Sequence, residues 1–165
     1  MKYVLYLMII FSCGLLYGQS KKIKVSRVID GDTFNCDWNG TNRSCRIANI
    51  DAPELKQHFG IQAYQKLANL VYGKIILVDS ISTDRYKRLI VFVRLENRRL
   101  DQFLVRQGYA WFYSDYSNDP GIATAMSRAV SQKLGLWSCG KEKVCPPWLF
   151  RHYDYRNKYR FCKGC

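Results

Sequence analysis

Short apolar runs separated by turn residues predict a chain rich in β-strands. Alternating apolar positions favour strands over Ile23–Ile29, Thr33–Trp38 and Arg43–Ile50. Two more strands are expected over Ile75–Val78 and Leu89–Leu95. The pattern in the first part of the chain therefore predicts a five-stranded sheet or barrel.

Three segments carry apolar residues at helical spacing instead. The first runs over Tyr64–Val71 and ends at Gly73, and the second is a short helix stopped by Gly108. The third begins at Asp119-Pro120, with proline in the first helical position. Its inward face is expected to hold Ala123, Met126, Val130 and Leu134. This order of strands and helices predicts an α+β fold, a small barrel capped by three helices.

A hairpin loop is predicted at Asn39–Asn42. If all four residues form the loop, Cys36 faces Cys45 across the two strands, close enough for a disulfide. A tighter turn at Asn39-Gly40 shifts the register by two residues and strains that bridge.

The beginning of the chain has the layout of a secretory signal peptide. Lys2 precedes the apolar run Val4–Phe11, and cleavage is expected before Gln19. The run is shorter than the roughly 20 residues that span a bilayer, although the lysines that follow it leave a membrane anchor as an alternative. Lipidation of Cys13 is the other alternative. We expect a secreted or periplasmic protein.

The chain is strongly basic, with 26 Lys and Arg against 13 Asp and Glu, a formal net charge of +13. Cleavage removes Lys2 and no acid, which lowers the charge by one. Such an excess predicts a polyanionic partner or an anionic surface. Charge alone does not separate nucleic acid from lipid or heparin-like polymers.

Six of the seven cysteines remain after cleavage. An even number in an exported chain favours disulfides over free thiols. The last four are also spaced as a four-thiolate zinc site would be, but an oxidising compartment competes for the thiolates. The candidate disulfide cysteines are Cys36, Cys45, Cys139, Cys145, Cys162 and Cys165.

Two carboxylates are candidates for a shared cation. In the four-residue-loop register, Asp32 faces Asn49, and Asp51 is a diagonal neighbour about 7–8 Å away. Unpaired acids at that distance repel, so a hard cation such as calcium, which takes oxygen ligands, is expected between them. Taken singly, each aspartate is also an ordinary turn residue.

Two arginines and a glutamate stand beside these acids in the sequence. Arg46 and Arg88 offer planar forks that match phosphate oxygens, and Glu54 lies on a loop from which it can reach a water. Strict strand alternation places Arg46 on the face opposite Asp51. A bulge or strong twist between Ile47 and Ile50 is therefore required.

The motifs Asp30–Thr33, Arg46–Glu54 and Asp84–Arg88 resemble, in order and separation, those of the thermonuclease (staphylococcal nuclease) family. The resemblance runs from about Lys22 to Ser138 and implies a five-stranded OB-fold barrel with three helices. We divide the chain into a signal peptide (1–18), a nuclease domain (19–138) and a Cys-rich, basic, aromatic extension (139–165).

The resemblance also implies a role for each site residue. Asp32 and Asp51 would bind calcium through their carboxylates and Ala52 through its backbone carbonyl. Arg46 and Arg88 would hold the phosphate, and a glutamate would be the general base. Glu54 is the glutamate in that position. The expected substrate contacts are Arg85, Tyr86, Tyr113 and Tyr116. Glycine is usual in the family where this chain has Lys87.

The implied activity is calcium-dependent hydrolysis of DNA and RNA by a monomeric endonuclease, without sequence preference and leaving 3′-phosphates. Single strands are the expected substrate, held by charge and base stacking. The alternatives are a nuclease-like binding module without catalysis and a basic protein that binds lipid or polysaccharide. The first typically lacks the acids or arginines that are present here.

The extension permits two interpretations. Its aromatic residues alternate with bases, and either they enlarge a nucleic-acid surface or they pack on the barrel as a flap tied by disulfides. His152 is expected to be a surface side chain. The residues concerned are Trp148, Phe150, Arg151, Tyr153, Tyr155, Arg156, Lys158, Tyr159 and Arg160.

Overall fold

The computed structural model describes residues 20–153 and 162. The predicted signal peptide, Cys13, Cys165 and the bases and aromatics of 154–161 lie outside the described residues. Within 20–153 and 162, none of the helices is long and apolar enough to cross a membrane.

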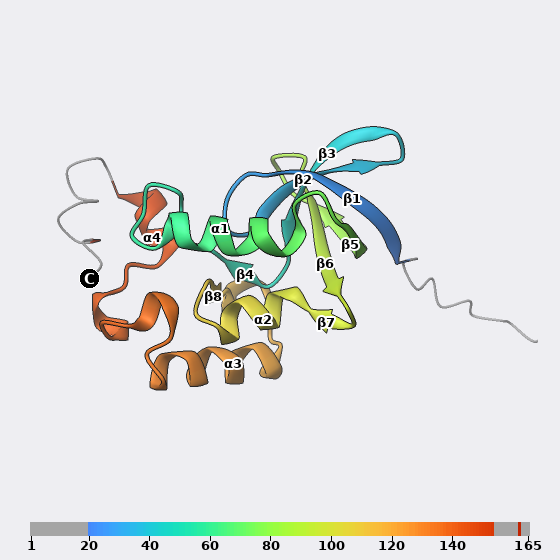
Figure 1. The fold of residues 1–165 in the computed structure, drawn as a ribbon. Coiled ribbons are helices and arrows are strands. Elements are labelled where there is room, and N and C mark those ends of the chain that lie inside the picture. Colours follow the sequence, from blue (N-terminus) through green and yellow to red (C-terminus); the bar gives the residue numbers. More distant parts are fainter. Residues whose placement is uncertain (1–19, 154–161, 163–165) are drawn as a thin grey trace, which may run out of the picture.

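Four antiparallel strand pairings and one parallel pairing close a barrel (Figure 1). The sheet order is β3-β2-β1-β5-β6, and a parallel pairing of β3 with β6 joins its two edges. The strands are β1 (Lys21–Val28), β2 (Thr33–Trp38), β3 (Thr41–Ile47), β5 (Ile75–Thr83) and β6 (Leu89–Leu95). The short strand β7 (Arg98–Arg99) extends the sheet beside β6. The predicted α+β fold with a five-stranded OB-type barrel is confirmed.

The β2–β3 hairpin does not have the register of a four-residue loop. Asn39 and Gly40, with φ of 56° and 76°, form a two-residue turn, so Cys36 pairs with Arg43 and Cys45 pairs with Phe34. The prediction of Cys36 opposite Cys45 is wrong, because positive φ at both turn residues matches the strand twist and favours the tighter turn. Both thiols still lie on the buried face, free and with 3.0 Å between the sulfur atoms.

Helices cover the barrel and extend it (Figure 1). The domain contains α1 (Gly60–Val71), α2 (Leu100–Arg106) and α3 (Pro120–Ser131), as predicted, with the 3₁₀ turns η1 (Ser114–Tyr116) and η2 (Gly135–Trp137). The extension adds η3 (Lys141–Lys143) and α4 (Pro147–His152), which the periodicity did not predict. The strands β4 (Ile50–Asp51) and β8 (Trp111–Phe112) form a separate two-stranded pair.

Helix α3 begins at the predicted residue, and its buried face matches the prediction only in part. The Asp119 side chain caps it by accepting the backbone N–H groups of Gly121 and Ile122. The buried residues are Ile122, Ala125 and Ala129. The predicted face is right in part, since Met126, Val130 and Leu134 are partly buried and pack against the cores. It is wrong in that Ile122, Ala125 and Ala129 form the fully buried line and Leu134 lies beyond the end of the helix at Ser131.

A second, smaller core joins the extension to the domain. Trp111 and Trp137 meet edge to face at 4.4 Å between ring centroids, and Trp148 of α4 meets Trp111 at 5.4 Å. Val144 is buried in the same cluster. The extension therefore packs some of its aromatic residues against the domain, as the flap interpretation expects.

Candidate active site

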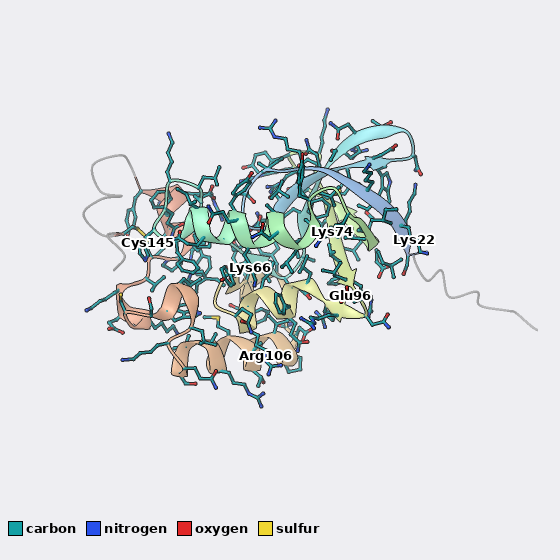
Figure 2. The ribbon with its side chains drawn as sticks, viewed as in Figure 1. Lys22, Lys66, Lys74, Glu96, Arg106 and Cys145 are labelled. Atoms are coloured by element: carbon teal, nitrogen blue, oxygen red, sulfur yellow. A yellow bond between two sulfur atoms is a disulfide. The ribbon has the colours of Figure 1, made fainter. Side chains whose placement is uncertain are left out.

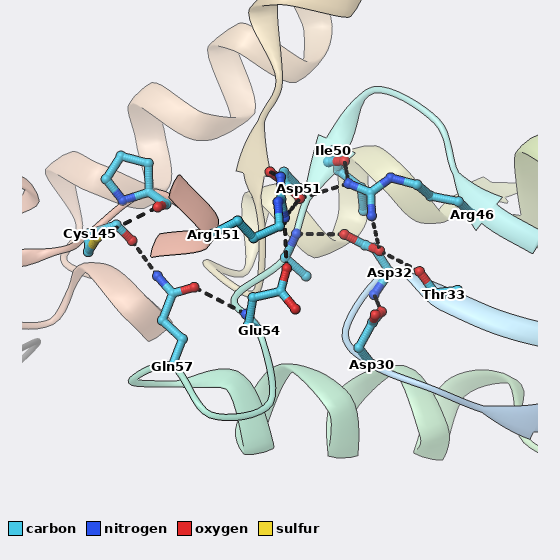
Figure 3. A network of polar contacts seen from close by, with 12 residues as sticks. Asp30, Asp32, Thr33, Arg46, Ile50, Asp51, Glu54, Gln57, Cys145 and Arg151 are labelled. Atoms are coloured by element: carbon cyan, nitrogen blue, oxygen red, sulfur yellow. Dashed lines mark hydrogen bonds and ion pairs between the residues drawn. The ribbon is translucent and has the colours of Figure 1, made fainter. Parts of the chain in front are cut away.

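The acidic motifs converge where the β1–β2 turn, β3, β4 and the loop before α1 meet (Figure 3). Asp32 is buried in the turn, and its side chain accepts three hydrogen bonds. Oδ1 accepts from the Thr33 hydroxyl at 2.8 Å and from Arg46 Nη1 at 2.7 Å, while Oδ2 accepts from the Ala52 N–H at 2.8 Å. These bonds fix the Asp32 carboxylate in one orientation.

The turn depends on a close approach at Gly31. A Cβ atom on this residue would lie 2.7 Å from the methyl carbons of both Ala52 and Ala63. Only glycine lets the Asp32 turn pack this closely against the β4 segment and α1.

Asp51 is fully buried on β4, where it pairs with Trp111 of β8. Its Oδ1 accepts a 2.7 Å hydrogen bond from Arg46 Nη2. Asn49 adopts a left-handed conformation with φ of 67° between β3 and β4. This conformation interrupts the strand alternation, so Asp51 can point to the same side as Arg46. The required twist between Ile47 and Ile50 is therefore present. The expected pairing of Asp32 with Asn49 is wrong, since Asp32 bonds instead to the N–H of Ile47 through its carbonyl.

One guanidinium group bridges the two aspartates. Arg46 contacts both carboxylates at 2.7 Å, so Asp32 and Asp51 lie near enough to share a single cation. Burial lowers the pKa of Arg46, but the two carboxylates raise it above its ordinary value, so the bridge remains charged.

Burial also raises the pKa of Asp30 to about 7, and repulsion from Asp32 adds to the increase.

The donor set fits a hard cation that completes its shell with water. Asp32 and Asp51 present carboxylate oxygens to one cationic group, Arg46, and the backbone of Ala52 follows Asp51 and donates its N–H to Asp32. Across the described ranges, no group of three or more His, Cys, Asp or Glu side chains is arranged to hold a metal ion. A cation here would therefore need backbone oxygens or water as further ligands, which calcium tolerates.

Arg88 lies beside Arg46 but does not reach the aspartates. Arg46 of β3 pairs with Ile90 of β6, and Arg88 lies in the loop directly before β6, so the register brings the two arginines to neighbouring segments. Arg88 forms an ion pair with Asp84 at 2.7 Å. Among the residues that the structure describes, it makes no direct contact with either candidate metal ligand.

The loop that carries Arg88 keeps the conformation expected of glycine. Lys87 has φ of 63°, so the replacement of the usual glycine leaves the turn left-handed. Arg85 donates to the Tyr86 hydroxyl at 2.8 Å and lies over its ring. Both side chains are exposed, and their contact with a substrate stays a prediction.

The model of the family described as staphylococcal nuclease homologue matches residues 44–139 of the chain. The chain belongs to this family. The match includes Arg46, Asp51, Glu54 and Arg88.

Three bacterial proteins are among the relatives of this chain. An Escherichia coli protein named as an uncharacterized endonuclease is 36% identical over 156 residues, which is 92% of this chain and 97% of the relative. A Shigella flexneri protein named micrococcal nuclease is 33% identical over 139 residues, 78% of this chain and 79% of the relative. A Haemophilus influenzae protein, also named an uncharacterized endonuclease, is 38% identical over 117 residues, 70% of this chain and 65% of the relative.

The nuclease homologue has one site residue that the motifs did not predict. Arg151 of α4 donates to both carboxylate oxygens of Asp51, at 3.1 and 2.7 Å, and to Glu54 Oε1 at 2.8 Å. Figure 3 shows its side chain reaching both acids from the extension. The alternation of basic and aromatic residues marked the segment, but no local pattern indicates a partner 100 residues away.

Glu54 stands at the mouth of the site. Its side chain is about a third exposed, and its backbone N–H donates to Gln57 Oε1 at 3.1 Å. A hollow of about 400 Å³ adjoins it, lined also by Asp30, Phe150 and Arg151. Glu54 therefore faces space that a water or a phosphate group can enter.

The two predicted stacking tyrosines lie together beside α4. Tyr113 and Tyr116 have ring centroids 4.8 Å apart, and Tyr116 is exposed. One face of Tyr113 carries Trp148, which stacks at 5.3 Å with an angle of 7° between the rings.

The cysteines of the extension are bonded. Cys145 forms a disulfide with Cys162, and Cys139 is disulfide-bonded as well. The zinc alternative is wrong for these three cysteines, because bonded sulfur atoms offer no thiolate.

Proposed function

We propose that this protein is a calcium-dependent nuclease that hydrolyses phosphodiester bonds of DNA and RNA and leaves 3′-phosphates. The observation that supports the proposal most directly is the convergence of Asp32 and Asp51 on one cation position beside Glu54. A binding module without catalysis needs no such arrangement, since charge and stacking suffice for affinity.

The metal site proposed here uses Asp32, Asp51 and the backbone carbonyl of Ala52. Calcium bound there supplies a Lewis acid for a phosphate oxygen. The protein's contribution is a dry, fixed pair of carboxylates, because Asp32 is 2% exposed and Asp51 is fully buried.

Glu54 is proposed as the general base that removes the proton of the attacking water. Its position beside an open hollow gives a water access to the carboxylate. Arg46 would donate hydrogen bonds to the phosphoryl oxygens as negative charge grows on them in the transition state. Arg88 would do the same from the loop before β6 after release from Asp84.

Affinity for the substrate is proposed to come from charge and stacking. Basic side chains lie at widely separated places, such as Lys22 at the start of β1 and Arg106 at the end of α2 (Figure 2). Tyr86 and Tyr116 are exposed rings on which bases can stack. Neither feature reads base edges, so we propose sequence-independent cleavage with a preference for single strands by a monomer.

We also propose that the protein acts outside the cytoplasm. The signal-like segment before Gln19 and the disulfide of Cys145 with Cys162 both support export. Mass spectrometry of the protein recovered from the periplasm or medium would test the proposed cleavage, since the mature chain should begin at Gln19.

The experiment that tests the activity compares plasmid DNA and RNA degradation with calcium and with a chelator. Cleavage should require calcium and should yield 3′-phosphate ends. An Arg46→Ala variant should lose activity, whereas Arg94→Ala, an exposed substitution on β6, should retain it. Binding of nucleic acid without cleavage would favour the binding module, and cleavage with the chelator present would refute the metal role.

A further inference from the structure

Helix α4 brings Arg151 onto the carboxylate that a bound cation would need. Asp51 Oδ1 accepts hydrogen bonds from both Arg46 and Arg151, and Oδ2 accepts from Arg151. Both oxygens of this candidate metal ligand are therefore already in contact with guanidinium groups. Glu54 is held by the same Arg151.

A divalent ion and Arg151 compete for the same oxygens. Calcium binds carboxylate oxygens at about 2.3–2.6 Å and can take both oxygens of one carboxylate. Arg151 Nη2 lies 2.7 Å from Asp51 Oδ2, so this oxygen already has a cationic partner that an ion would have to displace. Two positive groups this close also repel, and the repulsion is strong because Asp51 is shielded from water.

The same helix covers the aromatic part of the site. Trp148, three residues before Arg151 and thus on the same side of the helix, stacks almost parallel to Tyr113. A base that stacks on this face of Tyr113 has to take the place of the indole ring. One short helix therefore covers a metal ligand, the candidate base and a candidate stacking residue.

The helix is attached on both sides, while its contacts with the site remain open to solvent. Gln57 Nε2 donates to the Cys145 carbonyl at 2.5 Å, Phe150 is buried, and the Cys145–Cys162 disulfide ties the segment. By contrast, the Arg151 side chain is 41% exposed. The remaining attachments hold the extension when Arg151 leaves Asp51, and Arg46 still compensates the buried carboxylate. The other ion pair of Arg151, with Glu54, is partly exposed on both sides and contributes little.

We infer that α4 is a built-in competitor of the divalent ion and of the substrate base. Arg151 takes the place of the ion on Asp51 and holds Glu54, and Trp148 takes the place of a base on Tyr113. Binding of the ion exchanges Arg151 for metal. This inference rests on the proposed function in that Asp51 is taken as a metal ligand.

Calorimetry of calcium binding tests the exchange without any activity measurement. Arg151→Gln should bind calcium about tenfold more tightly than the unmodified protein, the change expected if Arg151 leaves the site open about one tenth of the time. Arg128→Gln, an exposed change on α3 that removes the same charge, should bind calcium as the unmodified protein does. Asp51→Asn should abolish binding in either background.

Amide hydrogen exchange in residues 147–152 shows whether calcium displaces Arg151 from Asp51 or whether removal of a positive charge alone raises the affinity. Calcium should raise exchange there in the unmodified protein, which requires no variant to fold. In Arg151→Gln, exchange should be high already and insensitive to calcium. Equal affinities and no calcium response in 147–152 would overturn the inference while leaving a calcium-dependent nuclease intact. Absence of calcium binding to all of the proteins would overturn both proposals.

Discussion

Arg151 follows Asp51 by 100 residues and donates hydrogen bonds to both of its carboxylate oxygens. The contact joins the extension to the centre of the candidate active site. Because Asp51 is fully buried, its charge requires compensation, and Arg46 and Arg151 together provide it when no ion is bound.

Asp51→Asn should destabilise the protein by about 3 kcal/mol, because it leaves two guanidinium groups without their buried partner. Urea unfolding followed by tryptophan fluorescence would measure the change. Asp115→Asn, at an exposed position in η1, should shift the midpoint little. A stability loss shared equally by both variants would contradict the role of burial at Asp51.

Arg46→Lys should reduce kcat by about 10²–10³-fold, the usual cost of losing one preorganised donor to a charged transition state. A lysine keeps the charge but presents a single ammonium group, which cannot span Asp32 and Asp51 as the planar fork does. Single-turnover cleavage of a short oligonucleotide would isolate the chemical step. A variant that keeps its rate would remove Arg46 from the mechanism.

Lys87→Gly should stabilise the protein by up to about 1 kcal/mol, since Lys87 holds a left-handed φ of 63° that glycine adopts without steric cost. The matched control is Arg85→Gly in the same loop, where φ is not positive and the added backbone freedom should destabilise. Thermal unfolding of both variants gives the comparison. Equal losses in the two would show that the turn does not favour glycine.

Asp119 should stabilise α3 in a pH-dependent way. Hydrogen bonding to Arg99 lowers the pKa of Asp119 below its ordinary value of 3.8. Its contribution is therefore complete above that value and is lost as the pH falls through the lower, folded pKa. Asp119→Ala should cost about 1 kcal/mol at neutral pH. Asp119→Asn should keep the cap but lose the pH dependence, as unfolding between pH 2 and pH 7 would reveal.

The barrel strands were predictable because each alternates between core and solvent, as β6 does from Leu89 to Leu95. The register of the β2–β3 hairpin was not, because a turn of two or four residues changes no apolar position in the pattern. The positive φ values of Asn39 and Gly40 form the two-residue turn that sets this register. The same uncertainty made the predicted partner of Asp32 wrong by two residues.

Residue types indicated which carboxylates and arginines form the candidate site, but not the contacts between them. The carboxylates and Arg46 meet because Asn49 bends the chain, a requirement that strand alternation itself imposed. Arg151 escaped prediction because its partners are distant in sequence and α4 has only 6 residues, too few for a periodic signal. Arg88 was expected to hold a phosphate, and in the structure it forms an ion pair with Asp84 of its own loop.

The pairing of β4 with β8 places Asp51 opposite Trp111, two residues before Tyr113, whose N–H donates to the Asn49 carbonyl. The cation ligand and the aromatic platform are thus fastened to each other through the backbone. If Tyr113 binds a nucleotide and Asp51 an ion, as proposed, a shift of either residue is expected to reach the other through this backbone pairing. Thermodynamic reciprocity then requires that each ligand alter the affinity for the other by the same factor.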